Sequence, residues 1–158
     1  MVNIVKEHTY EAMSHEIFGV NTFTILEKKS FSDRENAEFA GRITKIIVCN
    51  GEIIDGIQFV YENEREGEIH GNLNSIKHEF SMEENEYLIG ISWSVMWNTY
   101  YNGQVLSGIC FTTNTGKKFE VHGSLTCFAE DSFSYRSKEN HAILGLKGYA
   151  VKYFNAIM

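Results

Sequence analysis

The segment from Ile89 to Trp97 constrains the fold more than any other part of the sequence. Large apolar residues occupy every second position, with mainly glycine and serine between them; they are Ile89, Ile91, Trp93, Val95 and Trp97. Successive side chains of a β-strand point to opposite faces of a sheet, so the pattern predicts a long strand with one buried face. The same parity places Trp93, Val95 and Trp97 in the core.

Turn signals divide the rest of the chain into further β-rich runs. The sequence from Ile43 to Glu62 contains two such runs around Asn50-Gly51, a dipeptide typical of tight hairpins. The sequence from Gln104 to His122 has the same form around Thr115-Gly116. Helical periodicity is weak, and because the chain has no proline its turns depend on glycine, asparagine, aspartate and serine. These features predict one all-β domain, folded as a sandwich, a barrel or a prism.

Charge and hydropathy exclude several classes of partner. The 158 residues carry a formal net charge of −7, whereas nucleic-acid binding requires clustered lysine and arginine. No nucleic-acid partner is therefore expected, and no apolar run is long enough for membrane insertion. The N-terminus lacks the apolar stretch of a signal peptide, so we expect a soluble protein that is cytoplasmic or exported by a non-classical route.

Residues suited to catalysis or metal binding do not form recognisable motifs. The six histidines lack the spacing of a metal site, and no nucleophile or phosphate-binding motif is present. Acidic residues gather in runs of exposed character, such as Glu83, Glu84 and Glu86. Cys110 and Cys127 lie in apolar runs that predict buried thiols. We therefore expect a binding protein, with no enzyme activity, no metal and no cofactor.

Six segments, taken in order, resemble one known family. They are Phe31-Ser32-Asp33, Ile43–Tyr61, His70-Gly71, Glu84–Trp93, Leu106–Gly123 and Ala142–Ile157. Their order and spacing are similar to those of the jacalin-related lectins over about residues 17 to 158. The resemblance implies a single jacalin-like domain at 17–158, preceded by an N-terminal extension at 1–16. It also implies an all-β fold, a β-prism of three four-stranded antiparallel sheets with pseudo-threefold symmetry.

The resemblance implies a sugar-binding site among loops at one end of the prism. The family's C-terminal Gly-x-x-x-Asp loop falls on residues 151–155, where Val151 replaces the glycine and Asn155 replaces the aspartate. A carboxylate accepts hydrogen bonds from two adjacent sugar hydroxyls, and Asn155 lacks its charge. Val151 disfavours the positive φ that glycine adopts readily. The implied sugar-binding residues of this region are Tyr149, Val151, Lys152, Tyr153 and Asn155.

A second loop and two aromatic residues complete the implied site. The family has a glycine-rich loop near its N-terminus, of which Gly19 is the remnant in this sequence. Tyr100 and Tyr101 lie beyond the strand pattern, next to the turn signal Asn102-Gly103. In the resembled fold this connection lies beside the sugar-binding end, so both tyrosines are candidates for packing on the apolar face of a sugar ring.

The expected function is therefore carbohydrate binding through a non-standard site. The resemblance favours glycans or glycoproteins of the mannose or glucose type as partners, and members of the family often form homo-oligomers. The replacements at Val151 and Asn155 favour an alternative, in which the chain is a non-catalytic protein-interaction or structural module that has lost sugar binding.

Overall fold

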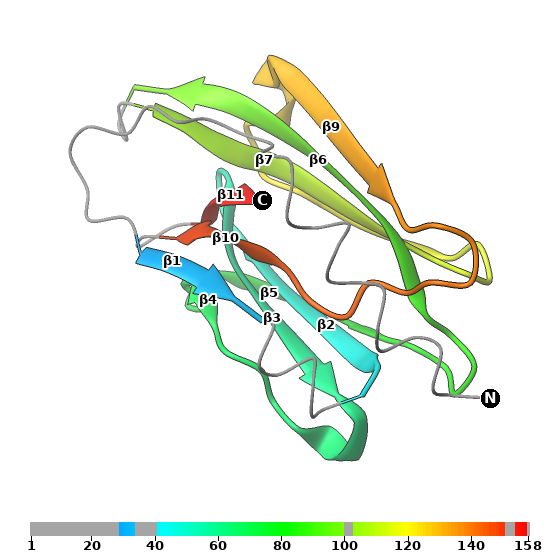
Figure 1. Ribbon diagram of the computed structural model, residues 1–158. Helices are drawn as coiled ribbons and strands as arrows, with labels where there is room; N and C mark the ends of the chain where they lie inside the picture. Colours follow the sequence, from blue (N-terminus) through cyan, green and yellow to red (C-terminus); the bar gives the residue numbers. More distant parts are fainter. Residues whose placement is uncertain (1–28, 34–40, 100–102, 151–153, 158) are drawn as a thin grey trace.

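A computed structural model describes residues 29–33, 41–99, 103–150 and 154–157 of the chain. Within these ranges the strands form three antiparallel sheets (Figure 1). The helical residues of the described chain lie in two short 3-10 turns, η1 (Glu62–Glu64) and η2 (Thr126–Phe128). The prediction of an all-β protein is confirmed.

The first sheet joins the start and the end of the described chain. It has the order β1-β10-β11 and is antiparallel at both pairings. Figure 1 shows β1, in blue, beside β10, in red, although nearly the whole described chain lies between them in sequence. The strands are β1 (Lys29–Ser32), β10 (Lys147–Ala150) and β11 (Phe154–Ile157).

The second sheet contains the hairpin that Asn50-Gly51 predicts. Its order is β4-β3-β2-β5, and Asn50 at the end of its strand pairs with Ile54 at the start of the next. The hairpin is confirmed, and in its connection the Gly51 N–H donates to the Ile53 carbonyl (3.0 Å). The strands are β2 (Ile43–Asn50), β3 (Ile54–Tyr61), β4 (His70–Gly71) and β5 (Ile76–Ser81).

The third sheet contains the two longest described strands and the second predicted hairpin. Its order is β8-β7-β6-β9. The turn between β7 and β8 places Gly116 at a φ of +88°, a conformation that glycine adopts without steric cost. Both this hairpin and the long strand after Ile89 are confirmed. The strands are β6 (Leu88–Asn98), β7 (Gly103–Thr113), β8 (Lys118–His122) and β9 (Asp131–Arg136).

The main core lies where the inner faces of the second and third sheets meet. Phe59 of β3 and Phe111 of β7 are both buried, and their rings meet edge to face with centroids 6.2 Å apart. Trp93 and Val95 of β6 are buried in the same cluster, as the alternation predicts. Burial of an apolar side chain of this kind contributes about 1.5–3 kcal/mol, so the cluster is a major source of stability.

Trp97 does not follow the alternation of its strand. β7 carries one extra residue, Ser107, at the point where β6 passes from Ser94 to Val95. Beyond this bulge Trp97 is 43% exposed, while the residues on either side of it are buried. Val95 still lies in the main core, but the next residue, Met96, is buried in a separate cluster with Ile53, so burial no longer alternates along this end of β6. The prediction that Trp97 lies in the core is wrong.

The three cysteines are free thiols in different environments. Cys49 is buried, Cys110 is half-buried and Cys127 is exposed. Cys110 lies on the outer face of β7, where it alternates with the buried Ile109 and Phe111, and Cys127 lies in η2. The prediction of buried thiols at Cys110 and Cys127 is therefore wrong, because neither apolar run turns its cysteine toward the core.

A buried polar contact ties the first sheet to the second. Asp33, just after β1, is 1% exposed, and its carboxylate lies 2.6 Å from Nε2 of His70 in β4. The same carboxylate accepts from the Leu146 backbone N–H, just before β10 (2.9 Å). Gly71, the residue after His70, has a φ of +87°, and a Cβ there would lie 2.3 Å from the backbone carbonyl oxygen of Asp55, so this position requires glycine. Three of the segments that carry the family resemblance, those containing Asp33, His70 and Leu146, therefore meet in the fold.

Candidate functional site

Two residues of the predicted sugar-binding loop lie in the paired strands β10 and β11. Tyr149 in β10 pairs with Ala156 of β11 on one side and with Ser30 of β1 on the other. The next pair is Ala150 with Phe154, so Asn155 falls between two pairs, at an irregularity of the register. Irregularities of this kind are common beside binding sites, because they direct the extra residue away from the regular ladder.

The other predicted site residues lie outside the described part of the chain. They are Gly19, Tyr100, Tyr101, Val151, Lys152 and Tyr153. The described strands that bracket the connections at 100–102 and 151–153 are neighbours, because β11 packs against β7. In Figure 1 the starts of these two strands lie toward the same end of the molecule. Their grouping into one sugar site stays a prediction.

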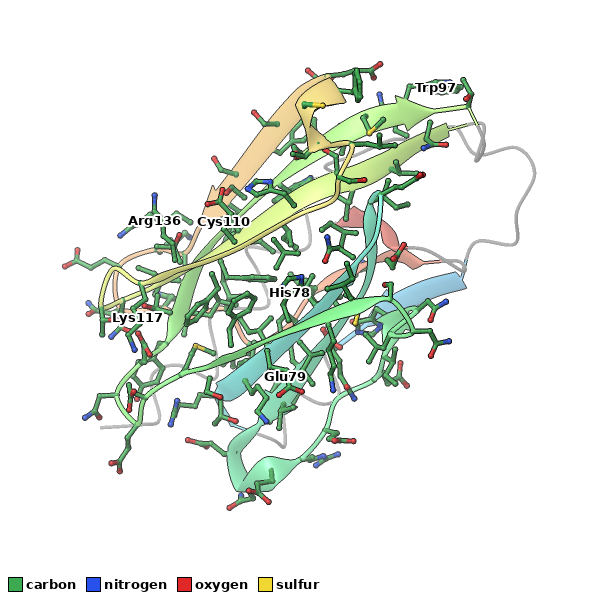
Figure 2. All side chains as sticks on the ribbon, turned by 180° about the vertical axis from the view of Figure 1, so that it is seen from behind. His78, Glu79, Trp97, Cys110, Lys117 and Arg136 are labelled. Carbon is green, nitrogen blue, oxygen red and sulfur yellow. The ribbon has the colours of Figure 1, made fainter. Side chains whose placement is uncertain are left out.

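Trp97 adds an exposed aromatic side chain near this end of the third sheet. It pairs with Gln104 close to the point where β6 passes to β7 (Figure 2). Because the alternation assigns Trp97 to the core, sequence reasoning missed it as a candidate for ligand contact. One signal was present: Trp97 is the last apolar residue of its face and lies just before Tyr100.

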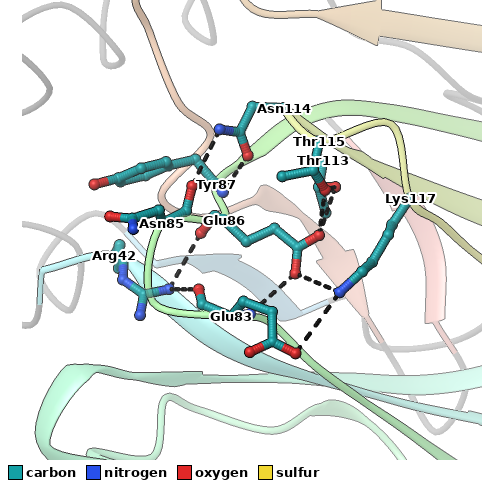
Figure 3. A network of polar contacts seen from close by, with 9 residues as sticks. All are labelled: Arg42, Glu83, Asn85, Glu86, Tyr87, Thr113, Asn114, Thr115 and Lys117. Atoms are coloured by element: carbon teal, nitrogen blue, oxygen red, sulfur yellow. Dashed lines mark hydrogen bonds and ion pairs between the residues drawn. The ribbon is translucent and has the colours of Figure 1, made fainter.

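A second group of polar side chains lies at the opposite end of the long strands. Glu86, between β5 and β6, is fully buried, and the exposed position expected for it is wrong. Its carboxylate accepts hydrogen bonds from the hydroxyls of Thr115 (2.5 Å) and Thr113 (3.0 Å) (Figure 3). It also accepts from the Glu83 backbone N–H (2.9 Å) and from Nζ of Lys117 (3.1 Å).

These donors keep Glu86 ionised in a buried position. The pKa of Glu86 is lowered from its ordinary 4.5 to about 2, and the hydrogen bond from Thr115 is the largest cause. Burial acts in the opposite direction, and the bonds from Glu83, Lys117 and Thr113 add to the lowering of the pKa. The carboxylate therefore ties the connection between β5 and β6 to the turn between β7 and β8.

Arg42 and Asn114 hold the next residue, Tyr87. The Arg42 guanidinium lies 5.9 Å from the centroid of the Tyr87 ring and donates to the carbonyls of Glu83 (3.0 Å) and Glu86 (3.1 Å). The Tyr87 backbone N–H donates to the side-chain oxygen of Asn114 (2.8 Å). Tyr87 is thus positioned through both its ring and its backbone (Figure 3).

A pocket of about 690 Å³ opens beside Tyr87. It lies between the start of β6, the turn between β7 and β8, and the segment that follows β9. Small-molecule sites typically have volumes of about 300–1,000 Å³, so the pocket has the size of a ligand site. The lining residues that give it its chemical character are Tyr87, Ile89, Asn114, Arg136, His141 and Ala142.

Histidines in the described residues have structural partners. Nε2 of His78 lies 2.7 Å from the Asn50 side-chain oxygen, and Nε2 of His122 lies 2.8 Å from the carboxylate of Glu120. Within the described ranges no three histidine, cysteine, aspartate or glutamate side chains gather as a metal site would require. No helix in the part of the chain that the structure describes is long and apolar enough to cross a membrane.

Comparison with protein families identifies the class of this chain. A family model described as the jacalin-like lectin domain matches residues 26–157, so the chain belongs to this family. The match spans all the described strands, together with both connections at 100–102 and 151–153. A comparison with curated proteins finds no match.

Solved structures of jacalin-related lectins have the same fold. A variant of Malaysian banana lectin is 22% identical, with a TM-score of 0.69, over 90% of this chain and 91% of that one. Artocarpin, solved with mannotriose, is 19% identical, with a TM-score of 0.66, over 85% and 96%. A mannose-binding jacalin-related lectin from Ananas comosus is 19% identical, with a TM-score of 0.66, over 90% and 91%. At these identities the likeness establishes the fold.

Proposed function

We propose that the protein is a non-catalytic lectin that binds mannose- or glucose-type units of glycans and glycoproteins. The observation that carries this proposal is the family match over residues 26–157. Artocarpin was solved with mannotriose, and the Ananas comosus relative is mannose-binding, which favours mannose-type sugars over galactose.

We also propose that the three sheets surround a pseudo-threefold axis as a β-prism. The second and third sheets support this, because both have a central hairpin flanked by the two strands that follow it in sequence. Residues 17–158 would form the domain, and residues 1–16 an extension before it. The sugar site would then lie at the end of the prism that the connection between β10 and β11 reaches.

The connection between β10 and β11 supplies the polar contacts of the proposed site. An amide at Asn155 and an ammonium group at Lys152 can hydrogen-bond sugar hydroxyls, but without the carboxylate that the family uses. Ring contacts therefore carry more of the binding, through Trp97, Tyr100 and Tyr101. The proposed sugar-binding residues of the connection and its strands are Tyr149, Val151, Lys152, Tyr153 and Asn155.

A glycan array followed by calorimetric titration tests this function. Methyl α-D-mannopyranoside is expected to bind with a dissociation constant of about 1 mM, equivalent to about 4 kcal/mol. Methyl β-D-galactopyranoside serves as the control and is expected to bind more weakly. The double variant Tyr100→Ala Tyr101→Ala should weaken mannoside binding. No binding to any glycan on the array or to the mannoside would overturn the proposal.

A second function is favoured by Val151 and Asn155 at the two signature positions. In this alternative the domain binds a protein partner and has lost sugar binding. The variant Val151→Gly Asn155→Asp discriminates between the two functions. Sugar binding that appears only in this variant would support the alternative, as would a protein partner that stays bound in excess methyl α-D-mannopyranoside.

We further propose that the protein forms a homo-oligomer, as members of the family often do. Several sites on one particle would raise avidity for multivalent glycoproteins without any new contact. Light scattering measures the mass directly, and a strictly monomeric protein at micromolar concentration would contradict this part of the proposal.

A further inference from the structure

The pocket beside Tyr87 is remote from the proposed glycan site. Tyr87 precedes β6 and Trp97 lies near its end, so at about 3.3 Å per residue they are roughly 30 Å apart along the strand. Figure 2 shows Trp97 at one end of the molecule and Arg136 and Lys117 at the other. A small ligand in this pocket would therefore not reach Trp97.

The pocket combines an apolar side with polar walls. Tyr87 packs against the buried Ala142 and Leu144, and Ile89 lines the same pocket. Asn114 is also a lining residue, and its amide keeps hydrogen-bonding capacity beyond the contacts it makes within the protein. An aromatic ring beside amide groups suits a ligand with one apolar face and a hydroxylated rim, which describes a sugar ring.

The walls are held in place by contacts within the protein. On one side the buried carboxylate of Glu86 fixes the turn that carries Asn114. On the other side the Ser137 hydroxyl donates to the His141 carbonyl (2.9 Å), and the Ser137 N–H donates to the Ile89 carbonyl (2.8 Å). A preformed pocket loses less conformational entropy on binding, which favours recognition of a small ligand.

The charge at the pocket differs in sign from that of the whole chain. Arg136 and Lys138 line it with two cations, and Glu139 adds one carboxylate, whereas the chain has a net charge of −7. Arg136 is exposed, and within the described residues its guanidinium has no ion pair with an acidic side chain. A planar guanidinium donates two parallel hydrogen bonds to a carboxylate, so Arg136 is suited to an anionic ligand.

We propose that this pocket is a second saccharide site, selective for a sugar that carries a carboxylate, such as a hexuronate unit. The sugar ring packs on Tyr87, its hydroxyls contact Asn114, and its carboxylate binds the Arg136 guanidinium. The site is independent of the function proposed above, because Tyr87, Asn114 and Arg136 are not among the residues proposed there to bind sugar. It would let one domain bind a neutral and an acidic glycan unit at opposite ends.

Titration with a matched pair of ligands tests this site. Methyl β-D-glucuronide and methyl β-D-glucopyranoside differ only at the carboxylate, and the glucuronide is expected to bind about tenfold more tightly. Amide signals of Tyr87, Asn114 and His141 should shift in NMR spectra as the glucuronide is added. Raising the salt concentration should weaken glucuronide binding, because part of the attraction is between exposed charges.

Variants and competition then separate this site from the glycan site. Arg136→Gln should abolish the preference for the glucuronide, while Arg65→Gln, the same change at an exposed arginine away from the pocket, should leave it intact. Unfolding midpoints of both variants should match the wild type, since both positions are exposed. Saturating methyl α-D-mannopyranoside should not displace the glucuronide.

Three results would overturn the second site. They are equal binding of glucuronide and glucoside, no glucuronide binding at all, or glucuronide binding that Arg136→Gln leaves unchanged. Each is measured on protein whose mannoside binding is recorded in parallel. If mannoside binds but one of these three results is found, the second site alone is refuted. If the glucuronide binds as expected but mannoside does not, the lectin function proposed earlier is refuted.

Discussion

The buried carboxylate of Glu86 provides the sharpest test of the structure, through the variant Glu86→Gln. The substitution keeps the size of the side chain but replaces an ionised acceptor with a neutral amide. Hydrogen bonds to a charged group contribute about 1.5–3 kcal/mol each and neutral ones about 0.5–1.5 kcal/mol, a difference of about 1 kcal/mol per bond.

Three of the four donors to Glu86 determine the size of the effect. Lys117 is 47% exposed and regains water when the charge is lost, so its bond counts little. The hydroxyl of Thr113 is buried and has no such compensation, whereas Thr115 and Glu83 are exposed residues whose donors regain water in part. At about 1 kcal/mol for each bond that is weakened without compensation, the expected loss is about 1–3 kcal/mol. Denaturant unfolding of both proteins, with unchanged slope, measures this free energy directly.

The control for this experiment is Glu84→Gln, two residues away and exposed, which should change the free energy of unfolding by no more than about 0.5 kcal/mol.

The pH dependence of the free energy of unfolding gives a second check. Because the pKa of Glu86 in the folded state is about 2, below its ordinary 4.5, its contribution is present above pH 4.5 and is lost as the pH falls toward 2. The difference between wild type and Glu86→Gln should shrink over that interval. A difference below about 1 kcal/mol at neutral pH, or one independent of pH, would show that the ionised Glu86 carboxylate does not stabilise the fold.

Three further substitutions test the roles of Trp97, Gly71 and His70. Trp97→Ala should weaken mannoside binding up to about tenfold and hardly change stability, because the ring is 43% exposed; calorimetry showing unchanged affinity would argue against Trp97 as a sugar contact. Gly71→Ala should destabilise the fold by more than about 1 kcal/mol, since φ is +87° and the new Cβ would lie 2.3 Å from the Asp55 carbonyl oxygen. His70→Leu should cost about 3–5 kcal/mol in denaturant unfolding, because it leaves the buried Asp33 carboxylate without this partner; a change near zero would mean that the contact is unimportant.

Features that depend on neighbouring residues could be predicted from the sequence. The alternation along β6 and the turn signals at Asn50-Gly51 and Thr115-Gly116 are local, and each led to the observed strand or hairpin. The family resemblance rests on the same local patterns taken in order, and the family match over residues 26–157 confirms it.

Features that depend on distant residues could not be predicted in this way. The side chains that donate to Glu86 lie 27 to 31 residues further along the chain, so the acidic residues next to it in sequence suggested the wrong environment. The alternation also failed at Trp97, because its neighbour Met96 is buried against the distant residue Ile53, a contact that no pattern within β6 reveals.

The two candidate sites also differ in whether the sequence could predict them. The sugar-binding residues on the connections at 100–102 and 151–153 stay predictions of the family resemblance, because the structure does not describe them. The pocket beside Tyr87 had no sequence signal, since its lining residues come from the start of β6, from Asn114 and from the segment after β9.

We propose that this jacalin-like domain binds sugar although Val151 and Asn155 occupy the signature positions. Calorimetric titration of the wild-type protein with methyl α-D-mannopyranoside tests it most directly. We expect saturable binding with a dissociation constant of about 1 mM. We also expect tighter binding by Val151→Gly Asn155→Asp, which restores the charged acceptor. The absence of any binding by the wild type, with binding restored in that variant, would contradict the claim.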